Sequence, residues 1–286
     1  MKIMKINNEE GIHLWESEPI IKHGTIFEYI KSCFNLYHHI LFKEFRAFKK
    51  NQTILDFGCG TGGYTIDLSK YTSAKIIGID ISQTQIDKAK INNEKWGGGS
   101  CFFQKYDGKK IPYPDNFFDG IISIDVFGHL PNLQAALYEL SRVLKPGGRF
   151  AVFSESRLTK GAFLQYWLFK RGIDIDSSSK HHISLFSRKE LIKMLNNAGL
   201  TVRKTYCPYR LRLLTHPEWF YPEVKKSNLS FLKIIISLMF WVKRITDPIY
   251  SIISSLLSIV EIHLFGKNRE TMGLFIYGEK NNPKAR

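Results

Sequence analysis

The sequence predicts an α/β protein built on a doubly wound, largely parallel sheet. Three observations predict this class. Short apolar runs alternate with helical patterns as far as about residue 154, which is typical of parallel strands joined by crossover helices. Three alternating glycines, Gly58, Gly60 and Gly62, follow the first run. The first two runs carry a carboxylate at their ends, Asp56 and Asp80. A length of 286 residues with 44% hydrophobic content suits one large domain, alone or with an appendage.

The glycine segment Ile54-Leu-Asp-Phe-Gly-Cys-Gly-Thr-Gly-Gly-Tyr-Thr65 indicates a binding turn between a strand and a helix. Glycine has no Cβ, so this backbone can turn sharply and a ligand can lie directly against it. The amide groups at the start of the next helix then face that ligand. Asp80 follows Asp56 by 24 residues, near the spacing of about 20 residues expected for an acid that binds a ribose. The pattern predicts a nucleoside-binding half-fold.

Two nucleoside cofactors compete for this segment. Gly58, Gly60 and Gly63 also satisfy the dinucleotide pattern G-x-G-x-x-G. Asp56, two residues before the first glycine, would face a pyrophosphate unfavourably. It would suit a ligand that carries an ammonium and a sulfonium group. The carboxylate therefore favours the second kind of ligand.

The pattern Asp-x-Gly-x-Gly-x-Gly at 56–62 resembles motif I of the class I S-adenosylmethionine-dependent methyltransferases. Four further segments resemble later motifs of that family in the same order: Gly78-Ile-Asp-Ile-Ser82, Tyr106-Asp-Gly108, Ile111-Pro-Tyr-Pro-Asp-Asn-Phe-Phe-Asp119 and Glu139-Leu-Ser-Arg-Val-Leu-Lys-Pro-Gly-Gly148. The resemblance covers about residues 52–207 and the last strand.

The resemblance implies a Rossmann-like, doubly wound, seven-stranded sheet whose last strand is antiparallel, with a helical insertion before that strand. It implies S-adenosyl-L-methionine as the cofactor, with the acid of the second motif on the ribose hydroxyls and Asp107 on the adenine amino group. The cofactor-binding residues expected on this basis are Asp56, Gly58, Cys59, Gly60, Thr61, Gly62, Asp80, Ile81, Asp107, Gly108 and Asp125.

The chain divides into a helical cap at 1–50, a cofactor-binding core at 51–207 and 271–280, and an insertion at 208–270. Apolar spacing predicts a helix over 24–50, and an aromatic, basic helix is expected over 158–171. A capped helix is expected from Ser187 to Gly199. Strands are expected over 149–154, 200–207 and 271–277. The turn at 139–148 should stop a helix at Pro146 and its two glycines.

The insertion contains two apolar segments, 231–242 and 249–260, each with a narrow polar stripe. Neither reaches the roughly 18–20 residues that span a bilayer. A basic turn joins them, so they resemble a hairpin that dips into one leaflet. Trp219, Phe220, Tyr221 and Trp241 would lie at the interface, and Lys225, Lys226, Lys243 and Arg244 near anionic headgroups. The alternatives are that the hairpin packs on the protein or forms a homodimer seam.

The positive charge lies mostly in the second half of the chain. Residues 1–156 hold 19 Lys/Arg and 17 Asp/Glu, whereas residues 157–286 hold 22 and 9. A basic half favours an anionic partner such as a membrane surface or a phosphorylated substrate, unless it is only a solvated surface. Four cysteines without C-x-x-C spacing and a polar N-terminus indicate a cytoplasmic protein. Peripheral binding at the inner face of the membrane would fit both features.

Candidates for catalysis are few. His129 resembles the histidine that many small-molecule members carry after strand four, and it is the candidate general base. The alternative is a histidine that only lines the cofactor site. His181, His182 and Tyr166 are expected on the acceptor side. No metal site is expected, because the adjacent pairs His38-His39 and His181-His182 cannot both face one ion from regular structure.

The sequence therefore predicts methyl transfer from S-adenosylmethionine to a hydrophobic or membrane-linked small molecule, such as a lipid, a quinone or a lipid-carried glycan intermediate. Three alternatives remain. The chain could be a soluble small-molecule methyltransferase whose insertion is a dimer seam or lid. It could be an RNA methyltransferase, although no RNA-binding module or base-stacking motif is evident. It could also be a non-catalytic cofactor-binding subunit of a partner.

Overall fold

The structure is a computed structural model that describes residues 5–6, 13–14, 17–97, 100–173, 182–208, 211–247, 249–266 and 271–282. Seven strands form one sheet: β3 (Thr53–Phe57), β4 (Lys75–Asp80), β5 (Cys101–Lys105), β6 (Phe118–Ile124), β7 (Leu144–Glu155), β8 (Leu200–Tyr206) and β9 (Gly273–Lys280). Their order is β5-β4-β3-β6-β7-β9-β8. β9 runs antiparallel to both β7 and β8, while the other pairs are parallel. The predicted doubly wound sheet with an antiparallel last strand is confirmed. A separate two-stranded sheet pairs β1 (Lys5–Ile6) with β2 (His13–Leu14).

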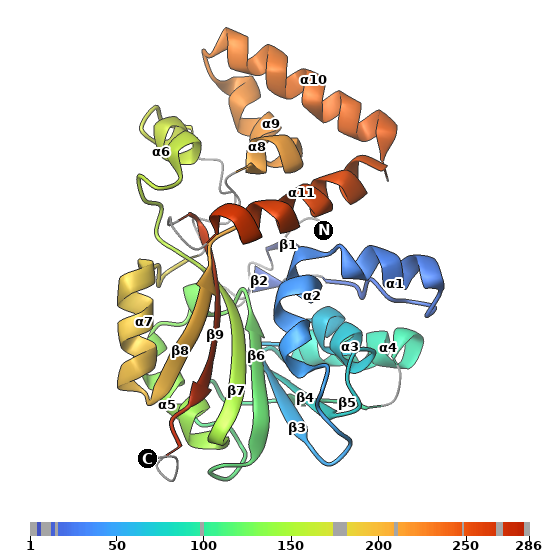
Figure 1. Cartoon of the computed structure of the whole chain (residues 1–286), viewed down its shortest axis with the longest axis vertical. Helices are drawn as coiled ribbons and strands as arrows, with labels where there is room; N and C mark the ends of the chain where they lie inside the picture. Colours follow the sequence, from blue (N-terminus) through green and yellow to red (C-terminus); the bar gives the residue numbers. More distant parts are fainter. Residues whose placement is uncertain are drawn as a thin grey trace.

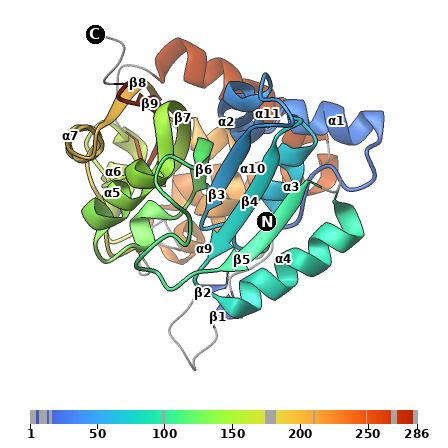
Figure 2. The ribbon, with the colours of Figure 1, turned by 90° about the horizontal axis from the view of Figure 1, so that it is seen from below.

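Helices cover both faces of the sheet (Figure 2), and the central strands β3 and β6 bury all but one residue each. On one face lie α2 (Leu36–Leu41), the short helix η1 (Phe42–Phe45), α3 (Gly63–Ser69) and α4 (Gln83–Trp96). On the other face lie α5 (Leu133–Val143) and α7 (Arg188–Asn197). This double coverage explains the continuous apolar runs of the sequence, because both faces of the central parallel strands are buried.

The N-terminal helix predicted over 24–50 is wrong as a single element. The structure breaks it into α1 (Ile26–Cys33), α2 and η1. Asn35 causes the break, because its side chain accepts a hydrogen bond from the backbone N–H of His38 and caps a new helix. Thr25 and Glu28 form a capping box at the start of α1. Apolar periodicity continues through a cap, so it could not reveal this boundary.

Three helices in the second half of the core were also predicted: the start of one is confirmed, and the bounds of the other two are corrected. Ser187 and Glu190 form the predicted capping box at the start of α7. The expected helix stop at Pro146 is wrong, since α5 ends at Val143 and β7 has already begun at Leu144. The helix expected over 158–171 is shorter, and α6 covers only Phe163–Phe169.

The insertion forms a helical layer beyond the carboxyl ends of the parallel strands (Figure 1). It consists of α8 (Arg212–Thr215), α9 (Pro217–Lys226), α10 (Ser230–Thr246) and α11 (Ile249–Phe265). A small core joins α6, α9 and α10 through Leu168, Phe220, Val224 and Ile236. Phe220 is fully buried there, which corrects its expected position at a membrane interface. In the described part of the chain no single helix is long and apolar enough to cross a bilayer. The pair α10 and α11, bent by 116° at its junction, has the length and composition of one broken span.

Candidate active site

The glycine loop joins β3 to α3 in the conformation that its glycines were predicted to permit. Gly58, Gly60 and Gly62 have φ values of +75°, +52° and +79°, a region that residues with a Cβ rarely occupy. The backbone N–H groups of Gly58 and Cys59 donate to the carbonyl oxygen of Ile79, at 2.9 and 3.0 Å. This contact fixes the loop to the end of β4. A Cβ on Gly62 would come within 2.8 Å of the Phe103 ring. The loop is therefore closely packed against β5 at this position.

Asp80 ends β4 and holds the glycine loop from the other side. Its Oδ2 accepts a hydrogen bond from Gly60 N at 3.0 Å, and its Oδ1 accepts one from Ser82 N at 2.9 Å. Burial raises the pKa of the Asp80 carboxyl above its usual value. Each carboxylate oxygen can accept a further hydrogen bond. The position is the one that the resemblance assigns to the ribose acceptor.

Asp56 lies on β3 and is almost completely buried, at 3% exposure. Burial raises the pKa of its carboxyl to about 7, while a 2.6 Å hydrogen bond from the Thr65 hydroxyl opposes that shift and nearby Asp80 adds to it. A buried carboxyl that titrates near neutrality would be ionised by a cationic ligand beside it. This is the behaviour expected of a group that meets the ammonium end of the cofactor.

Two residues of the loop turn their side chains toward the protein. Cys59 is buried, and its Cβ and Sγ lie against the backbone of Gly78. Burial, with the Asp56 and Asp80 carboxylates, raises the pKa of the Cys59 thiol well above its usual value. The Thr61 hydroxyl donates to Ser17 O at 2.8 Å and accepts from Ser17 N at 2.9 Å. These residues can therefore face a cofactor through their backbone.

Ile81, Asp107 and Gly108 follow the ends of β4 and β5. Ile81 is 49% exposed, and a Cβ on Gly108 would lie 3.4 Å from its Cγ2, so the structure brings these two residues together. The Asp107 carboxylate accepts hydrogen bonds from Lys109 N at 2.8 Å and Lys110 N at 3.0 Å, which lower its pKa. In this structure the Asp107 carboxylate is hydrogen-bonded to the backbone of the turn that follows it. Its contact with the adenine amino group stays a prediction.

The turn after β6 packs against the glycine loop. Asp125 has a φ of +58°, an uncommon value for a residue with a side chain and one that often marks functional sites. Its backbone N–H donates to Phe153 O at 3.1 Å, which ties the turn to β7. The Val126 side chain fills the space beside Gly58. The short helix η2 (Phe127–His129) follows this turn directly, and His129 is its last residue.

His129, His182 and Glu155 form a cluster beside this turn. The imidazole rings of His129 and His182 lie 4.9 Å apart between centroids. His182 Nε2 is 3.2 Å from Glu155 Oε1, and the His182 side chain is fully buried. Burial favours a raised pKa for Glu155, but the hydrogen bond and charge of His182 outweigh burial, so the pKa is lowered. The structure brings His182 beside His129, and the expected role of His182 on the acceptor side stays a prediction.

The remaining predicted residues lie elsewhere or outside the description. Tyr166 lies on α6 in the upper helical layer, with the Lys170 ammonium 5.6 Å from its ring centroid. His181 falls outside the described residues. Sequence reasoning missed Glu155, although it ends a strand at the same edge as Asp80. The structure also brings together ligand atoms that the argument from adjacent histidine pairs did not consider, since those of His129, Glu155 and His182 lie within 4.8 Å of one another.

The core matches a known family, and its site agrees with that match. Residues 55–152 match the family model described as a methyltransferase domain. This stretch contains the glycine loop, Asp80 and the turn before His129. Residues 55–152 thus form a methyltransferase domain whose cofactor is S-adenosylmethionine, and the sheet order is the one predicted for a class I methyltransferase.

Part of the chain is also similar in sequence to two methyltransferases of known substrate. Sterol 24-C-methyltransferase of Pneumocystis carinii (strain B80) is 40% identical over 113 residues, which cover 39% of this chain and 30% of that protein. Cycloartenol-C-24-methyltransferase 1 of Oryza sativa subsp. japonica is 34% identical over 140 residues, covering 49% of this chain and 40% of that protein. The chain thus matches less than half of the length of either relative.

Solved structures share the fold at low sequence identity. Geranyl diphosphate methyltransferase in complex with GPP and sinefungin aligns with a TM-score of 0.53 and 13% identity, covering 84% of this chain and 74% of that chain. The cyclase SpnF aligns with a TM-score of 0.54 and 18% identity, covering 84% and 78%. A methyltransferase and a cyclase share this architecture, so the fold alone does not determine the reaction.

Proposed function

We propose that this protein transfers the methyl group of S-adenosylmethionine to a hydrophobic acceptor of the lipid class, which it meets at a membrane surface. The sterol and cycloartenol methyltransferases that it resembles act, by their names, on hydrophobic lipids. The observation that carries the proposal is the reversed polarity of α11. A helix of a water-exposed layer normally turns its apolar side inward.

In α11 the polar stripe faces the protein and the aliphatic side faces outward. Ser254 and Ser258 are both 5% exposed, and the Ser258 hydroxyl donates to the carbonyl oxygen of Ser254. Aliphatic residues on the other side are 40–64% exposed: Ile249, Ile253, Leu256, Leu257, Val260 and Leu264. A serine hydroxyl that donates to the helix backbone, as that of Ser258 does, can be buried without leaving its donor unpaired. The aliphatic face is left for an apolar environment.

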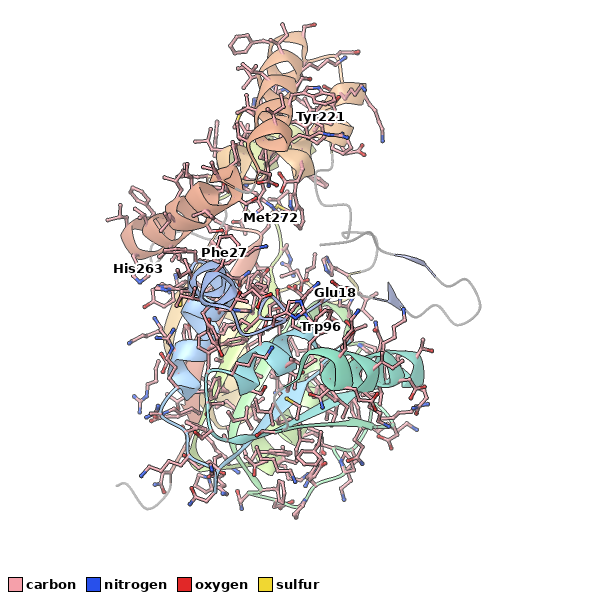
Figure 3. The ribbon with its side chains drawn as sticks, turned by 90° about the vertical axis from the view of Figure 1, so that its right-hand side faces the viewer. Glu18, Phe27, Trp96, Tyr221, His263 and Met272 are labelled. Atoms are coloured by element: carbon pink, nitrogen blue, oxygen red, sulfur yellow. The ribbon has the colours of Figure 1, made fainter. Side chains whose placement is uncertain are left out.

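Helix α10 adds a second exposed apolar surface. Phe231 and Ile245, near its two ends, are each 78% exposed, and Ile234 and Leu238 between them are 68% and 65% exposed. Ile236 is buried against α9 and anchors the helix. Figure 3 shows this helical layer standing away from the core, with Met272 between the two. Contiguous apolar surface of this kind marks an interaction site rather than ordinary surface.

Basic residues near these helices suit an anionic membrane. Lys225 and Lys226 end α9, and the Arg244 guanidinium lies 5.2 Å from the Trp241 ring centroid on α10. Each Lys or Arg near an anionic surface contributes about 1 kcal/mol. Lys243 is paired with Glu218 at 2.6 Å, so its part in headgroup binding is smaller than the sequence suggested.

An apolar hollow of about 550 Å³ lies between α6 and the start of α10. Side chains of Phe163, Leu164 and Trp167 line it from α6, and residues 228–232 line it from the other side. Its lining is mainly hydrocarbon, which suits the apolar chain of a lipid. The hollow belongs to the same layer as the exposed faces of α10 and α11, so an acceptor leaving the membrane would meet it first.

The reaction requires alignment more than acid–base chemistry. A nucleophilic atom of the acceptor forms a bond to the methyl carbon while the carbon–sulfur bond breaks, and the bonding pair stays on sulfur as S-adenosylhomocysteine. Correct orientation of two reactants is equivalent to roughly 7–11 kcal/mol of the barrier. The Asp80 and glycine-loop contacts would hold the donor, and the turn that carries His129 would border the acceptor.

Incubation of the purified protein with methyl-labelled S-adenosylmethionine and separated lipid, polar and RNA extracts tests this proposal. Label in the lipid extract is the expected result, and Asp80→Ala should remove it. Label in the polar extract would favour a soluble small-molecule methyltransferase, and label in RNA would favour an RNA methyltransferase. Cofactor binding without transfer to any extract would favour a non-catalytic subunit.

A further inference from the structure

We propose that His129, Glu155 and His182 form a binding site for one divalent transition-metal ion of the zinc type. Their ligand atoms, two imidazole nitrogens and one carboxylate oxygen, all lie within 4.8 Å of one another. They come from three separate segments: η2 after β6, the last residue of β7, and the stretch that precedes α7. Two histidines with one carboxylate are a common ligand set for zinc and non-haem iron.

The separations suit a metal of this size. Zinc bonds to histidine nitrogen at about 2.0–2.1 Å and to carboxylate oxygen at about 2.0–2.2 Å, so neighbouring ligands of a tetrahedral ion lie roughly 3.4 Å apart. His182 Nε2 and Glu155 Oε1 are 3.2 Å apart. The His129 ring lies 4.9 Å from the His182 ring between centroids. The ligand atoms of all three residues lie within 4.8 Å of one another, so His129 is near enough to complete the site.

The fold holds these side chains in place. The backbone N–H groups of Ile183 and Ser184 donate to Gly128 O at 2.9 and 3.0 Å, which pins the segment after His182 to the turn that carries His129. Gly128 also leaves the necessary space, since a Cβ there would lie 3.0 Å from the His182 ring and 3.2 Å from Glu155 Oε2. Rigid second-layer contacts of this kind are what orient metal ligands.

A simple ion pair between Glu155 and His182 is the competing explanation. That pair uses one carboxylate oxygen. The other, Oε2, is buried and has no hydrogen-bond partner within the described residues, a costly state for a carboxylate oxygen. A cation at the centre of the cluster compensates this oxygen as well as the first, which the ion pair does not.

Three protein ligands leave a fourth position open, as in catalytic rather than structural zinc sites. The cluster lies at the carboxyl ends of β6 and β7, where ligands bind in open α/β sheets. Water or an oxygen of the acceptor would fill the open position. Metal binding does not depend on which acceptor is methylated, so the inference and the proposed function can fail separately.

Calorimetry with Zn²⁺ and visible spectroscopy with Co²⁺ test the site in the full-length protein. The wild type should bind one equivalent and give the absorption of tetrahedral Co²⁺. Glu155→Gln keeps the shape of the side chain but removes the ligand charge. Glu155→Gln and His182→Gln should each weaken Zn²⁺ binding by at least about 100-fold. This is the upper end of the effect of losing a residue that only supports a metal ligand. Unchanged affinity in Glu155→Gln would establish the ion pair instead.

The matched control is His263→Gln. His263 is exposed, and its ring centroid lies 5.5 Å from that of the half-buried His39, so this variant reports adventitious zinc binding. Its affinity should equal that of the wild type, and an equal loss there would overturn the proposal. S-adenosylmethionine binding verifies that each variant is folded. If Glu155→Gln does not fold, His129→Cys decides: a thiolate–Co²⁺ charge-transfer band that the wild type, with its four native cysteines, does not give shows that residue 129 is a ligand.

Discussion

Asp56 and Asp80 lie on the adjacent strands β3 and β4, and burial raises the pKa of both carboxyls. Their remaining contacts differ. Asp80 accepts two backbone hydrogen bonds, whereas Asp56 accepts one from a side-chain hydroxyl. The difference suits two tasks at the two ends of one cofactor: Asp80 for neutral hydroxyls and Asp56 for a cation.

Asp80→Ala should weaken S-adenosylmethionine binding by about 1.5–3 kcal/mol, the usual effect of losing a hydrogen bond to a charged group. Calorimetry measures the change. Asp87→Ala is the matched control, because Asp87 lies on the exposed side of the next helix and accepts a hydrogen bond from the exposed Gln83. Equal affinities for wild type and Asp80→Ala would remove Asp80 from the ribose site.

The raised pKa of Asp56 predicts a pH dependence of cofactor binding. Below about pH 7 the free carboxyl is protonated, so a cationic ligand must displace a proton and binds more weakly. Affinity should rise from about pH 6 and level off above the pKa, with proton release at the lower pH. Calorimetry in buffers of different ionisation enthalpy measures both, and Asp56→Asn should flatten the profile.

The same carboxyl affects the stability of the cofactor-free protein in the opposite direction. Its pKa rises from 3.8 to about 7 on folding. The stability that it contributes is therefore present below about pH 4 and is lost as the pH rises through 7. The wild type should lose stability relative to Asp56→Asn across this range in thermal unfolding. A constant difference between the two proteins would show that Asp56 is not buried as described.

The glycine loop requires glycine at position 62 for two reasons: the backbone there is left-handed, and there is no space for a Cβ. Gly62→Ala should destabilise the protein by more than the roughly 1–2 kcal/mol of a left-handed backbone alone, because its Cβ would meet Phe103 at 2.8 Å and Ala89 at 3.1 Å. It should also impair cofactor binding. Gly172→Ala separates the two causes, since Gly172 has a φ of +74° and a Cβ added there would meet no atom of the described residues within 4 Å. Equal losses on thermal unfolding would refute the packing argument.

Helices α10 and α11 should attach the protein to anionic membranes. Liposome flotation should recover the wild type with anionic vesicles, partly released by high salt. Phe231→Ser and Ile245→Ser should each weaken attachment about tenfold, since burying such a side chain is worth about 1.5–3 kcal/mol. Ile91→Ser is the control, because Ile91 is 61% exposed on α4, outside this layer.

Failure of the wild type to float would leave the exposed faces of α10 and α11 to another partner. If deletion of 229–265 then converts a dimer into a monomer, the insertion is a subunit seam. The soluble small-molecule reaction would then be the better proposal.

Across the whole molecule, Asp67 joins parts that are far apart in the sequence. Its carboxylate accepts from Ile20 N at 2.8 Å and Ile21 N at 2.9 Å, and it lies 3.2 Å from His38 Nε2. Asp67→Ala should lower the free energy of unfolding by about 3–5 kcal/mol, the usual result of removing one member of a buried polar pair. Thermal unfolding against Asp87→Ala measures this. An effect below 1 kcal/mol would mean that the N-terminal segment is held by other contacts.

The sequence by itself determined the sheet, the glycine loop, the class of cofactor and the presence of two apolar helices in the insertion. These features are local, because strand runs, glycine spacing and helix periodicity are written in neighbouring residues. The apolar repeat did not reveal the helix boundary at Asn35, because this residue caps a new helix while the repeat continues through it.

Only the tertiary structure decided which side of α11 faces the protein and which residues meet at the acceptor side. A stripe of serines predicts a polar face but does not say that the face is turned inward. Glu155 and His182 stand on separate segments, and no spacing rule connects them with His129. They converge because parallel strands end at one edge of the sheet, so residues distant in the chain meet there once β6 and β7 are paired.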